Sequence, residues 1–565
     1  MVQKTLDEKE VKPEKLTKAD EMATKQREIS VAAFFEKNRH LLGFDNPRKA
    51  LLTTIKEAVD NSLDACEEAE ILPEIIVEMI ELSEGKFRII IEDNGPGIVK
   101  AQVPKIFAKL LYGSKFHKLS QSRGQQGIGI SASVMYAQLT TGKPAKIISK
   151  VPGREAHQYQ LHIDTQNNKP EIVSDEVKEW NKEQGVRIEL DLEGSYHKGS
   201  QSVDEYLKQT AIVNPHITLI YTNPKAEQII FPRATDTLPV QPKEIKPHPY
   251  GIELGMLIRM IKYAESRSLQ SFLMSEFSRV GAGTAKEICE NAALLPNTKP
   301  KNITREMAES LMNGIKKTKI ISPPTDCISP ITAPLLEKGL RKEINAEFYT
   351  TITRPPSVYR GNPFIIEVGL AYGGEQPGDK AVKLLRFANR VPLLFQQGAG
   401  AVNKSVATTN WRPYGLQQSG NNIPVGPLTI LVHIGSVWVP FTSESKEAIA
   451  QYPEIMKEIK LAIQECGRKL GSYVNKKKRV KDELKKRSYI EKYIPHVGDA
   501  LVELLGLKEE ESGKIKAMLE IILEKTRGEV EEVGKIDNPD YDEELAKIGK
   551  EDKMEEEDDS SSRED

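Results

Sequence analysis

The sequence predicts an α+β protein of several domains. Its 565 residues suggest three or four domains at about 150 residues each. Two helical patterns near the N-terminus precede a series of alternating strands, which is typical of a two-layer α/β sandwich. Two proline-rich joints, at residues 239–249 and 321–324, separate regions whose apolar patterns differ. We therefore expect an α/β sandwich, a small helical insertion and a third domain that is again α/β.

The first domain begins with helices and continues with strands. Apolar residues recur at intervals of three and four from Ile29, and again after Asn46-Pro47, so a helix is expected in each place. A hairpin is expected where residues 75–80 and 87–92 flank a Ser-Glu-Gly-Lys turn. Further strands are expected at residues 146–149, 158–163, 186–192 and 217–221.

The middle region shows helical patterns only, and the third domain ends in a long helix. Four helices are expected at residues 256–264, 269–277, 284–293 and 305–316. Strands of the third domain are expected at residues 364–369, 384–389 and 429–434. From Ser443 one helical pattern runs to about Tyr493, and a last amphipathic segment follows Gly506.

Charge is divided unevenly along the chain. From Glu529 to Asp565, 17 acidic and 5 basic residues give a charge of −12, which leaves +10 for the rest because the whole chain carries −2. A basic body with an acidic tail indicates polyanion binding or a regulatory tail. We expect the tail to be disordered and the charged segment before Gln26 to be a flexible arm.

Composition also indicates where the protein works. Four scattered cysteines without a CxxC pair exclude a disulfide framework and a thiolate zinc site, and they suit a reducing cytosol. No apolar run approaches the roughly 20 residues of a membrane helix. The N-terminus is too charged for a signal peptide. We therefore expect a cytoplasmic protein with no membrane partner.

Three short segments of the first domain carry residues suited to nucleotide chemistry. In the first, Glu57 and Asn61 are four residues apart, so a helix places them on one face. A carboxylate beside a carboxamide suits a water-activating base next to a hard-cation ligand, because Mg²⁺ prefers oxygen donors. Taken alone, the motif is better explained as a polar helix face.

The second segment, Asp93-Asn94-Gly95-Pro96-Gly97, follows an apolar strand. A carboxylate at a strand end can accept a hydrogen bond from an exocyclic amine, and glycines such as Gly97 let a flat ring approach the backbone. The alternative is a plain Asp-Asn-Gly turn.

The third segment, residues 124–131, precedes an apolar helix at residues 132–139. Three glycines before a helix N-terminus expose backbone N–H groups where the helix dipole favours anions, which makes a phosphate cradle. No strand runs directly into the segment and no Gly-Lys-Ser follows it, so neither the dinucleotide fingerprint nor the Walker loop fits.

In this order, Glu57xxxAsn61, Asp93xGlyxGly97 and Gly124xxGlyxGly129 resemble the motifs of the ATPases that group gyrase, heat-shock chaperone, histidine kinase and mismatch-repair proteins. The resemblance implies that Glu57 is the general base, that Asn61 is the Mg²⁺ ligand and that Asp93 reads the adenine amine of ATP. A Gly-Thr pair that usually helps to hold adenine is Gly185-Val186 here, without the hydroxyl. The phosphates would be held by Gly124, Gln125, Gln126, Gly127, Ile128, Gly129, Ile130 and Ser131.

The chain from about Glu28 to Ala500 is similar to the DNA topoisomerase VI B subunits, the ATPase subunits of type IIB topoisomerases. The helical insertion resembles a helix-two-turn-helix module, and Leu384–Arg390 resembles the strand signature of a transducer domain. The resemblance implies an N-terminal arm at 1–28, an ATPase domain at 29–247, a helix-two-turn-helix domain at 248–325, a transducer domain with the long helix at 326–505, and an amphipathic segment with the disordered acidic tail at 506–565.

By the same resemblance, Lys446 is a switch lysine that reaches from the transducer to the γ-phosphate, where a cation stabilises charge on the transferred phosphoryl group. The alternative is a solvated lysine in the first turn of a helix capped by Thr442 or Ser443. Ser114 and Lys115 would belong to the nucleotide lid, although lysines in such loops are usually solvated.

Residues 476–487 form a basic run of Lys and Arg within the expected long helix. The run could contact DNA phosphates. Because Asp482 and Glu483 lie inside it, a solvated or subunit-facing helix is an equally good interpretation.

The resemblance implies an ATP-hydrolysing subunit of a type IIB DNA topoisomerase. ATP and Mg²⁺ would close two copies of the chain around duplex DNA. That closure would drive strand passage through a double-strand break made by a separate cleavage (A) subunit of a heterotetramer near the nucleoid. A chaperone-like ATP-driven protein clamp is the alternative, but it needs neither the helical insertion nor the basic helix. A histidine kinase needs a phospho-accepting His on a dimerising helix, and we find none.

Overall fold

The computed structural model describes residues 18–26, 28–115, 118–124, 127–442, 446–506, 508 and 511–527. They divide into two compact units. One comprises the chain up to Thr409 together with Pro427–Ile463, and the other comprises Asn410–Gly426 and the chain from Gln464 onward.

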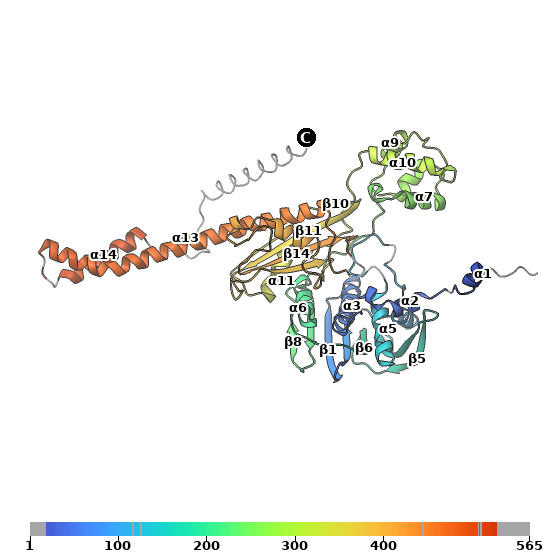
Figure 1. Ribbon diagram of the computed structural model, residues 1–565, viewed down its shortest axis with the longest axis horizontal. Coiled ribbons are helices and arrows are strands. Elements are labelled where there is room, and N and C mark those ends of the chain that lie inside the picture. Colours follow the sequence, from blue (N-terminus) through green and yellow to red (C-terminus); the bar gives the residue numbers. More distant parts are fainter. Residues whose placement is uncertain are drawn as a thin grey trace, which may run out of the picture. The chain divides into compact units, whose positions relative to one another are not determined.

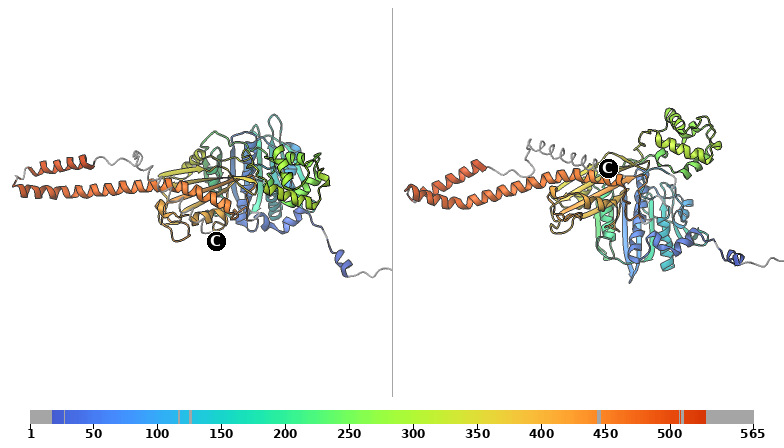
Figure 2. Two further views of the ribbon diagram at one scale, coloured as in Figure 1. Left: turned by 90° about the horizontal axis from the view of Figure 1, so that it is seen from above. Right: turned by 45° about the horizontal axis from the view of Figure 1, so that its top comes forward.

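The N-terminal part of the first unit is a two-layer α/β sandwich. Its eight-stranded sheet has the order β5-β4-β3-β6-β2-β1-β7-β8, and helices α3, α5 and α6 lie on one face (Figures 1 and 2). The strands are β1 (Glu74–Ser83), β2 (Lys86–Asp93), β3 (Ala145–Lys150), β4 (Ala156–Asp164), β5 (Lys169–Lys178), β6 (Gly185–Glu193), β7 (Thr218–Thr222) and β8 (Gln228–Phe231). The helices are α2 (Val31–Lys37), α3 (Pro47–Glu68), α4 (Val103–Ala108), α5 (Gly129–Thr141) and α6 (Val203–Val213).

Local signals explain why α3 forms where the sequence predicts it. The Asn46 side chain accepts a hydrogen bond from the backbone N–H of Lys49, and Pro47 takes the first helical position. The face with Leu51, Ile55 and Leu63 is at most 1% exposed, so it packs on the sheet. The opposite side of this helix is left to carry polar residues.

All six strands expected in this domain are present, and β1 and β2 pair as the predicted antiparallel hairpin. Two strands escaped the sequence analysis, β5 and β8. Both lie at edges of the sheet, and β5 has exposed or half-exposed residues throughout. An edge strand without a buried face has no apolar alternation to read.

The helical insertion has its own core and matches the expectation closely. Helices α7, α8, α9 and α10 enclose a cluster that includes Leu257, Phe272, Ile288 and Leu311, each fully buried. Their bounds are Leu254–Tyr263, Leu269–Glu276, Ala282–Asn291 and Arg305–Lys317.

A second sheet of six strands follows, with β9 paired to β11 beside the order β10-β11-β14-β12-β13. Its strands are β9 (Phe348–Thr353), β10 (Ser357–Tyr359), β11 (Asn362–Tyr372), β12 (Lys383–Ala388), β13 (Val391–Pro392) and β14 (Leu428–Ser436). Helix α11 (Ala333–Glu343) packs against β9 and β11, and α12 (Gly400–Thr408) precedes β14. Every residue of β14 is buried, so this strand is covered on both faces although an alternating pattern was expected for it.

The long helix α13 runs from Pro453 to Leu505, so the expected span from Ser443 to Tyr493 was wrong at both ends. Upstream of Pro453 the chain forms a bridged loop in which Phe441 pairs with Ile449, and Lys446 has a φ of +53°. The local sequence pattern from Ser443 predicts a helix, but the pairing of Phe441 with Ile449 holds this part of the chain in a loop.

Helix α14 (Ser512–Arg527) matches the amphipathic segment expected after Gly506. Helix α1 (Lys18–Ala23) lies within the arm expected to be flexible, where no helix was predicted. Residues 1–17 and the acidic tail lie outside the described residues. Among the helices that the structure describes, none combines the length and apolar character needed to cross a membrane.

Candidate functional site

A cavity of about 640 Å³ in the first unit brings the three sequence motifs together. One wall is α3, a second follows the end of β2, and a third is the segment at residues 124–131, called the glycine-rich loop below. Helix α5 begins within this segment, at Gly129, three residues before the expected start. Residues after β13 and around position 446 close the remaining side. The lining includes Glu57, Asn61, Asp93, Gly97, Tyr112, Gly113, Ser114, Lys115, Gly124, Gly127, Ile128, Gly129, Ile130, Val186, Leu393, Leu394, Phe395 and Lys446.

Glu57 and Asn61 both line the cavity from one face of α3, as their spacing predicts. The Lys56 ammonium lies 3.1 Å from a carboxylate oxygen of Glu57. Burial raises the pKa of Glu57, but the positive charges of Lys56 and Lys446 outweigh it and hold that pKa below its ordinary value. The carboxylate is therefore ionised at neutral pH, the state that a general base requires.

Glu57 lies directly against the start of α5. A Cβ atom on Gly129 would come 1.8 Å from Glu57 Oε2, so any side chain there would displace the carboxylate. Glycine at this position is what allows the helix N-terminus, with its anion-attracting N–H groups, to approach the Glu57 carboxylate.

Asp93 ends β2 and is almost completely buried. One carboxylate oxygen accepts the Ser62 hydroxyl at 2.7 Å, and the other accepts the backbone N–H groups of Gly95 at 3.0 Å and Val186 at 3.1 Å. Burial raises the pKa of Asp93, and these three hydrogen bonds partly offset the effect. A carboxylate offers about four acceptor positions, so one remains for an amine in the cavity.

Two glycines let backbone segments meet beside Asp93. Gly97 has a φ of +72°, and a Cβ there would lie 2.0 Å from the carbonyl oxygen of Lys150. Gly185 has a φ of +132°, and a Cβ there would lie 2.2 Å from the carbonyl oxygen of Asp93. Only glycine fits either position. Val186, the next residue, presents an apolar wall to the cavity.

The glycine-rich loop is described only in part. Gly124 and residues 127–130 line the cavity, whereas Gln125 and Gln126 lie outside the described residues. Ser131 is 1% exposed and its hydroxyl donates to the carbonyl of Ile128, so it is not part of the cavity lining.

Lys115 lines the cavity together with Ser114, but its ammonium is paired with carboxylates of α3. It lies 2.7 Å from Asp64 and 2.8 Å from Glu68. The expected alternative, a solvated loop lysine, does not describe it. To contact a nucleotide, Lys115 would have to exchange these partners.

Lys446 also lines the cavity, and its Nζ donates to the backbone carbonyl of Arg123 at 3.3 Å. Burial lowers the pKa of Lys446, and the nearby Glu57 carboxylate partly offsets this. Because Lys446 lies in the bridged loop upstream of α13, the alternative of a lysine in the first turn of that helix was wrong.

A magnesium site fits the donors at this end of the cavity. The Asn61 Oδ1 lies 4.0 Å from the position that a Cβ on Gly124 would take, which directs it toward the glycine-rich loop. Among the described residues, no group of three His, Cys, Asp or Glu side chains could hold a metal by itself. Mg²⁺ prefers oxygen ligands and keeps several waters beside substrate phosphates, so it needs few oxygens from the protein, and the Asn61 carboxamide can supply one.

Sequence reasoning missed Ser62 and Lys56. Ser62 is next to Asn61 in the chain, but its partner Asp93 is 31 residues away, so no local pattern connects them. Lys56 precedes Glu57 and would point elsewhere on an ideal helix, yet its long side chain folds back to the carboxylate.

The basic run at residues 476–487 lies on α13 in the second unit. Two of its cations pair along the helix, Lys486 with Glu483 at 3.0 Å and Arg487 with Glu491 at 3.0 Å. These pairs are compatible with either expected role for the run, DNA contact or a solvated face.

Two parts of the chain match known protein families, and relatives match most of its length. Residues 50–194 match the family described as histidine kinase-, DNA gyrase B-, and HSP90-like ATPase, and residues 323–486 match the topoisomerase VI B subunit transducer. The B subunit of type 2 DNA topoisomerase 6 from Methanococcoides burtonii is 54% identical over 489 residues, covering 86% of this chain and 79% of that protein. The proteins of the same name from Methanosarcina barkeri and Archaeoglobus fulgidus are 51% and 48% identical, covering 86% and 88% of this chain and 79% and 83% of their own.

Proposed function

Because this chain belongs to the family of type 2 DNA topoisomerase 6 B subunits, we propose that its cavity binds ATP with Mg²⁺ and closes a DNA clamp. The chain is the ATPase subunit of a type IIB DNA topoisomerase. The observation that carries the proposal is that Glu57, Asn61, Asp93 and the glycine-rich loop line a single cavity.

Each residue has a role that follows from its surroundings. Asp93, with one acceptor position left, receives the adenine amine, and the N–H groups at the start of α5 receive the phosphates. Glu57, ionised and beside Gly129, takes the proton of the attacking water. Mg²⁺ held by Asn61 would neutralise charge on the phosphate oxygens. Lys446 supplies a cation for the γ-phosphate, and Ser114 and Lys115 cover the nucleotide.

The clamp requires partners, and we propose three: a second copy of the chain, duplex DNA and a cleavage subunit in a heterotetramer. The names of the relatives imply DNA and an A subunit. A second copy is supported by α2, where Phe34 is 40% and Val31 36% exposed. This helix comes just before Leu41 and Leu42, which line the cavity, and uncovered apolar side chains there suit a contact that forms on closure.

The function is tested by measuring ATP turnover of the full chain with the cleavage subunit, with and without duplex DNA. We expect DNA to stimulate turnover and ATP to support relaxation of supercoils. Turnover that is indifferent to DNA but stimulated by unfolded protein would favour the chaperone-like clamp.

The clamp is tested by sedimentation and by one variant. We expect a larger mass with a non-hydrolysable ATP analogue than without it, and an identical mass in both would contradict the clamp. Lys446→Ala should still bind nucleotide but lose strand passage, because the transducer then has no cation to follow the γ-phosphate.

A further inference from the structure

The three residues before the glycine-rich loop, Gln121–Arg123, make contacts that the ATPase chemistry does not require; we call them the anchor segment. The Gln121 N–H donates to the carbonyl of Cys327 at 2.9 Å. Its side chain accepts the Ser329 N–H at 2.9 Å and donates to the Ser329 carbonyl at 3.2 Å. The first anchor residue is thus bound to the chain just before α11, the helix that packs against β9 and β11 of the second sheet.

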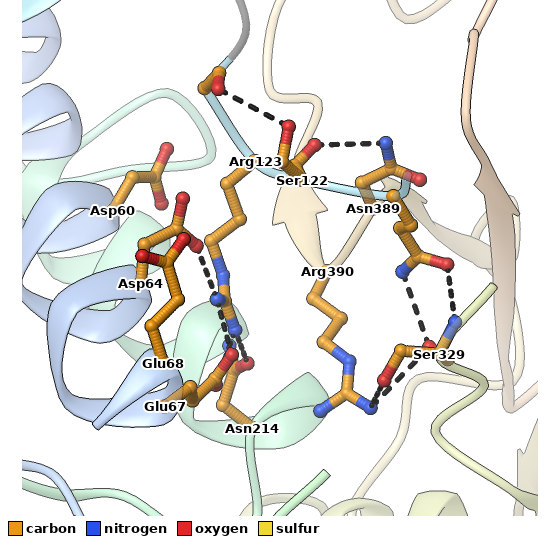
Figure 3. Close-up of polar contacts among 12 residues, drawn as sticks. Asp60, Asp64, Glu67, Glu68, Ser122, Arg123, Asn214, Ser329, Asn389 and Arg390 are labelled. Atoms are coloured by element: carbon orange, nitrogen blue, oxygen red, sulfur yellow. Dashed lines mark hydrogen bonds and ion pairs between the residues drawn. The ribbon is translucent and has the colours of Figure 1, made fainter. Parts of the chain in front are cut away.

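The second anchor residue is bound to the second sheet itself. The carbonyl of Ser122 accepts a hydrogen bond from Asn389 Nδ2 at 3.0 Å (Figure 3). Asn389 follows β12 in a left-handed conformation, with a φ of +48°. Its carboxamide also donates to the Ser436 carbonyl at 3.0 Å and accepts the Ser436 N–H at 2.9 Å. The side chain therefore joins two strands of the sheet to the anchor segment.

The third anchor residue, Arg123, is fixed to the ATPase helix. Its guanidinium contacts both carboxylate oxygens of Glu67 at 2.7 Å, Asp64 at 2.7 Å and the Asn214 carboxamide at 2.7 Å (Figure 3). The side chain is 4% exposed. Asp64 and Glu67 are on α3, the helix that carries Glu57 and Asn61. Arg123 thus sets the distance between the loop and the helix of the base.

This buried cluster is held together by close pairs of opposite charges. Glu67 also accepts a hydrogen bond from His216 at 2.8 Å. Burial raises the pKa of Glu67, but Arg123 and His216 outweigh it and hold the pKa well below its ordinary value. Separating such charges leaves each buried without a partner, which is strongly unfavourable. The anchor segment is therefore held against α3 on one side and the second sheet on the other.

We propose that the anchor segment couples the glycine-rich loop to the transducer sheet, with Arg123 and Asn389 as its positioning residues. Gly124, the first loop residue at the cavity, follows Arg123 directly. When the loop adjusts to phosphates, the Ser122 carbonyl shifts with it, and Asn389 carries that shift into β12 and β14. The inference deepens the proposed function, since it names residues that link ATP binding to clamp movement besides Lys446.

The test uses Asn389→Asp in the full chain with the cleavage subunit. The carboxylate can still accept the Ser436 N–H, and aspartate tolerates the left-handed backbone, but it cannot donate to the Ser122 carbonyl or to the Ser436 carbonyl. We expect the Michaelis constant and turnover number for ATP to stay within about twofold, while strand-passage events per ATP hydrolysed fall about fivefold or more, a typical coupling effect. A purely structural role would lower both activities in proportion.

The matched control is Gln376→Glu. The Gln376 carboxamide donates to the carbonyls of Ala371 and Gly373 at 2.9 and 3.1 Å and accepts the Thr429 hydroxyl at 2.6 Å, without touching the anchor segment. This control should keep the wild-type ratio of strand passage to ATP hydrolysis.

If Asn389→Asp also lowers ATP turnover, Gln121→Glu decides, because it removes only the bond that the Gln121 side chain donates to Ser329. An unchanged ratio in both variants would overturn the inference. Wild-type protein without DNA-stimulated turnover would instead refute the proposed function.

Arg123→Lys tests the other side of the segment. Lysine keeps the charge but cannot bridge Glu67 and Asp64 with a planar fork. We expect the turnover number to fall about tenfold with little change in ADP affinity, because the loop is no longer held at a fixed distance from Glu57. Equal turnover numbers in wild type and variant would remove Arg123 from the positioning role.

Discussion

The two ends of the cavity are built differently. Around Asp93, the end that we assign to the adenine base, the protein's own hydrogen bonds are already made and glycines let backbone segments pack together. Around Glu57, the end that we assign to the phosphates, lysines from three segments are paired with carboxylates or with a backbone carbonyl. The phosphates of a nucleotide would compete with these partners for the lysines.

The difference suggests that the end around Asp93, called the base end after the adenine base, recognises the nucleotide. The phosphate end around Glu57 changes its contacts when the nucleotide binds. A preformed pocket binds without reorganisation, so it contributes affinity and selectivity in any state of the clamp. Lys115 and Lys446 must change partners to contact phosphates, so their new contacts can favour the closed state. Substitutions at the phosphate end should therefore alter turnover and movement, and those at the base end should alter binding.

The largest expected effect is at Glu57. Glu57→Ala should lower ATP turnover about 10²-fold or more while nucleotide affinity stays close to wild type, because the base acts on the attacking water. Single-turnover hydrolysis and binding of a non-hydrolysable analogue measure the two quantities separately. A large loss of affinity with normal turnover would reverse the assignment of the two ends.

Asp93 should show the opposite signature. Asp93→Asn replaces an acceptor with a group that also donates, so the adenine amine and the Gly95 and Val186 N–H groups lose a charged partner. We expect ATP affinity to fall about 10- to 100-fold, with less discrimination between adenine and guanine. Competition binding with ATP and GTP measures this, and an unchanged base preference would contradict the pocket. Ser62→Ala, which removes only the supporting hydroxyl, should cost less.

Much of this arrangement was predictable because the decisive signals are local. The Glu57–Asn61 spacing, the strand ending at Asp93 and the glycines at the start of α5 each follow from a few neighbouring residues. The helices of the insertion were found for the same reason. The roles assigned to the site residues remain predictions.

The features that escaped prediction depend on residues far apart in the chain. Arg123 joins α3 to the end of α6, and Asn389 reaches a carbonyl 267 residues away. The start of α13 was misplaced because the pairing of Phe441 with Ile449 competes with local helix propensity. Such contacts have no fixed spacing, so a single sequence does not display them.

Lys56 offers a pH test of the phosphate end. Burial raises the pKa of Glu57, but the charges of Lys56 and Lys446 outweigh this and hold the pKa below its ordinary value. Asp60 lies beside these groups, and burial raises its pKa to about 6. A general base is active only when it is ionised, which for a carboxylate means at a pH above its pKa. Wild-type ATP turnover should therefore fall through protonation of Glu57 only at a pH below the ordinary pKa of a glutamate. Lys56→Met removes one cation, so the acid limb of the turnover–pH profile should move to higher pH, with a few-fold loss of turnover near pH 6.

The matched control is Lys49→Met, which removes a cation paired with Glu447 and Asp45 instead of Glu57. Its acid limb should stay where the wild type has it. Coincident profiles for Lys56→Met and wild type would show that Lys56 does not set the ionisation of the base.

The smallest effect should come from Val186→Thr, which restores the hydroxyl of the usual Gly-Thr pair. The backbone N–H of Val186 already donates to Asp93 at 3.1 Å, and the Ser62 hydroxyl donates to the other carboxylate oxygen at 2.7 Å. Because the base end is satisfied without a hydroxyl, a new one gains at most a water-mediated contact and loses some apolar wall. We expect the dissociation constant of an ATP analogue, measured by calorimetry, to change by less than about threefold, since such a contact is worth well under the roughly 1.4 kcal/mol of a tenfold change. A tenfold gain in affinity would mean that the base end of this chain lacks a contact that the hydroxyl supplies. The base end would then not be preformed, and the proposed difference between the two ends of the cavity would be wrong.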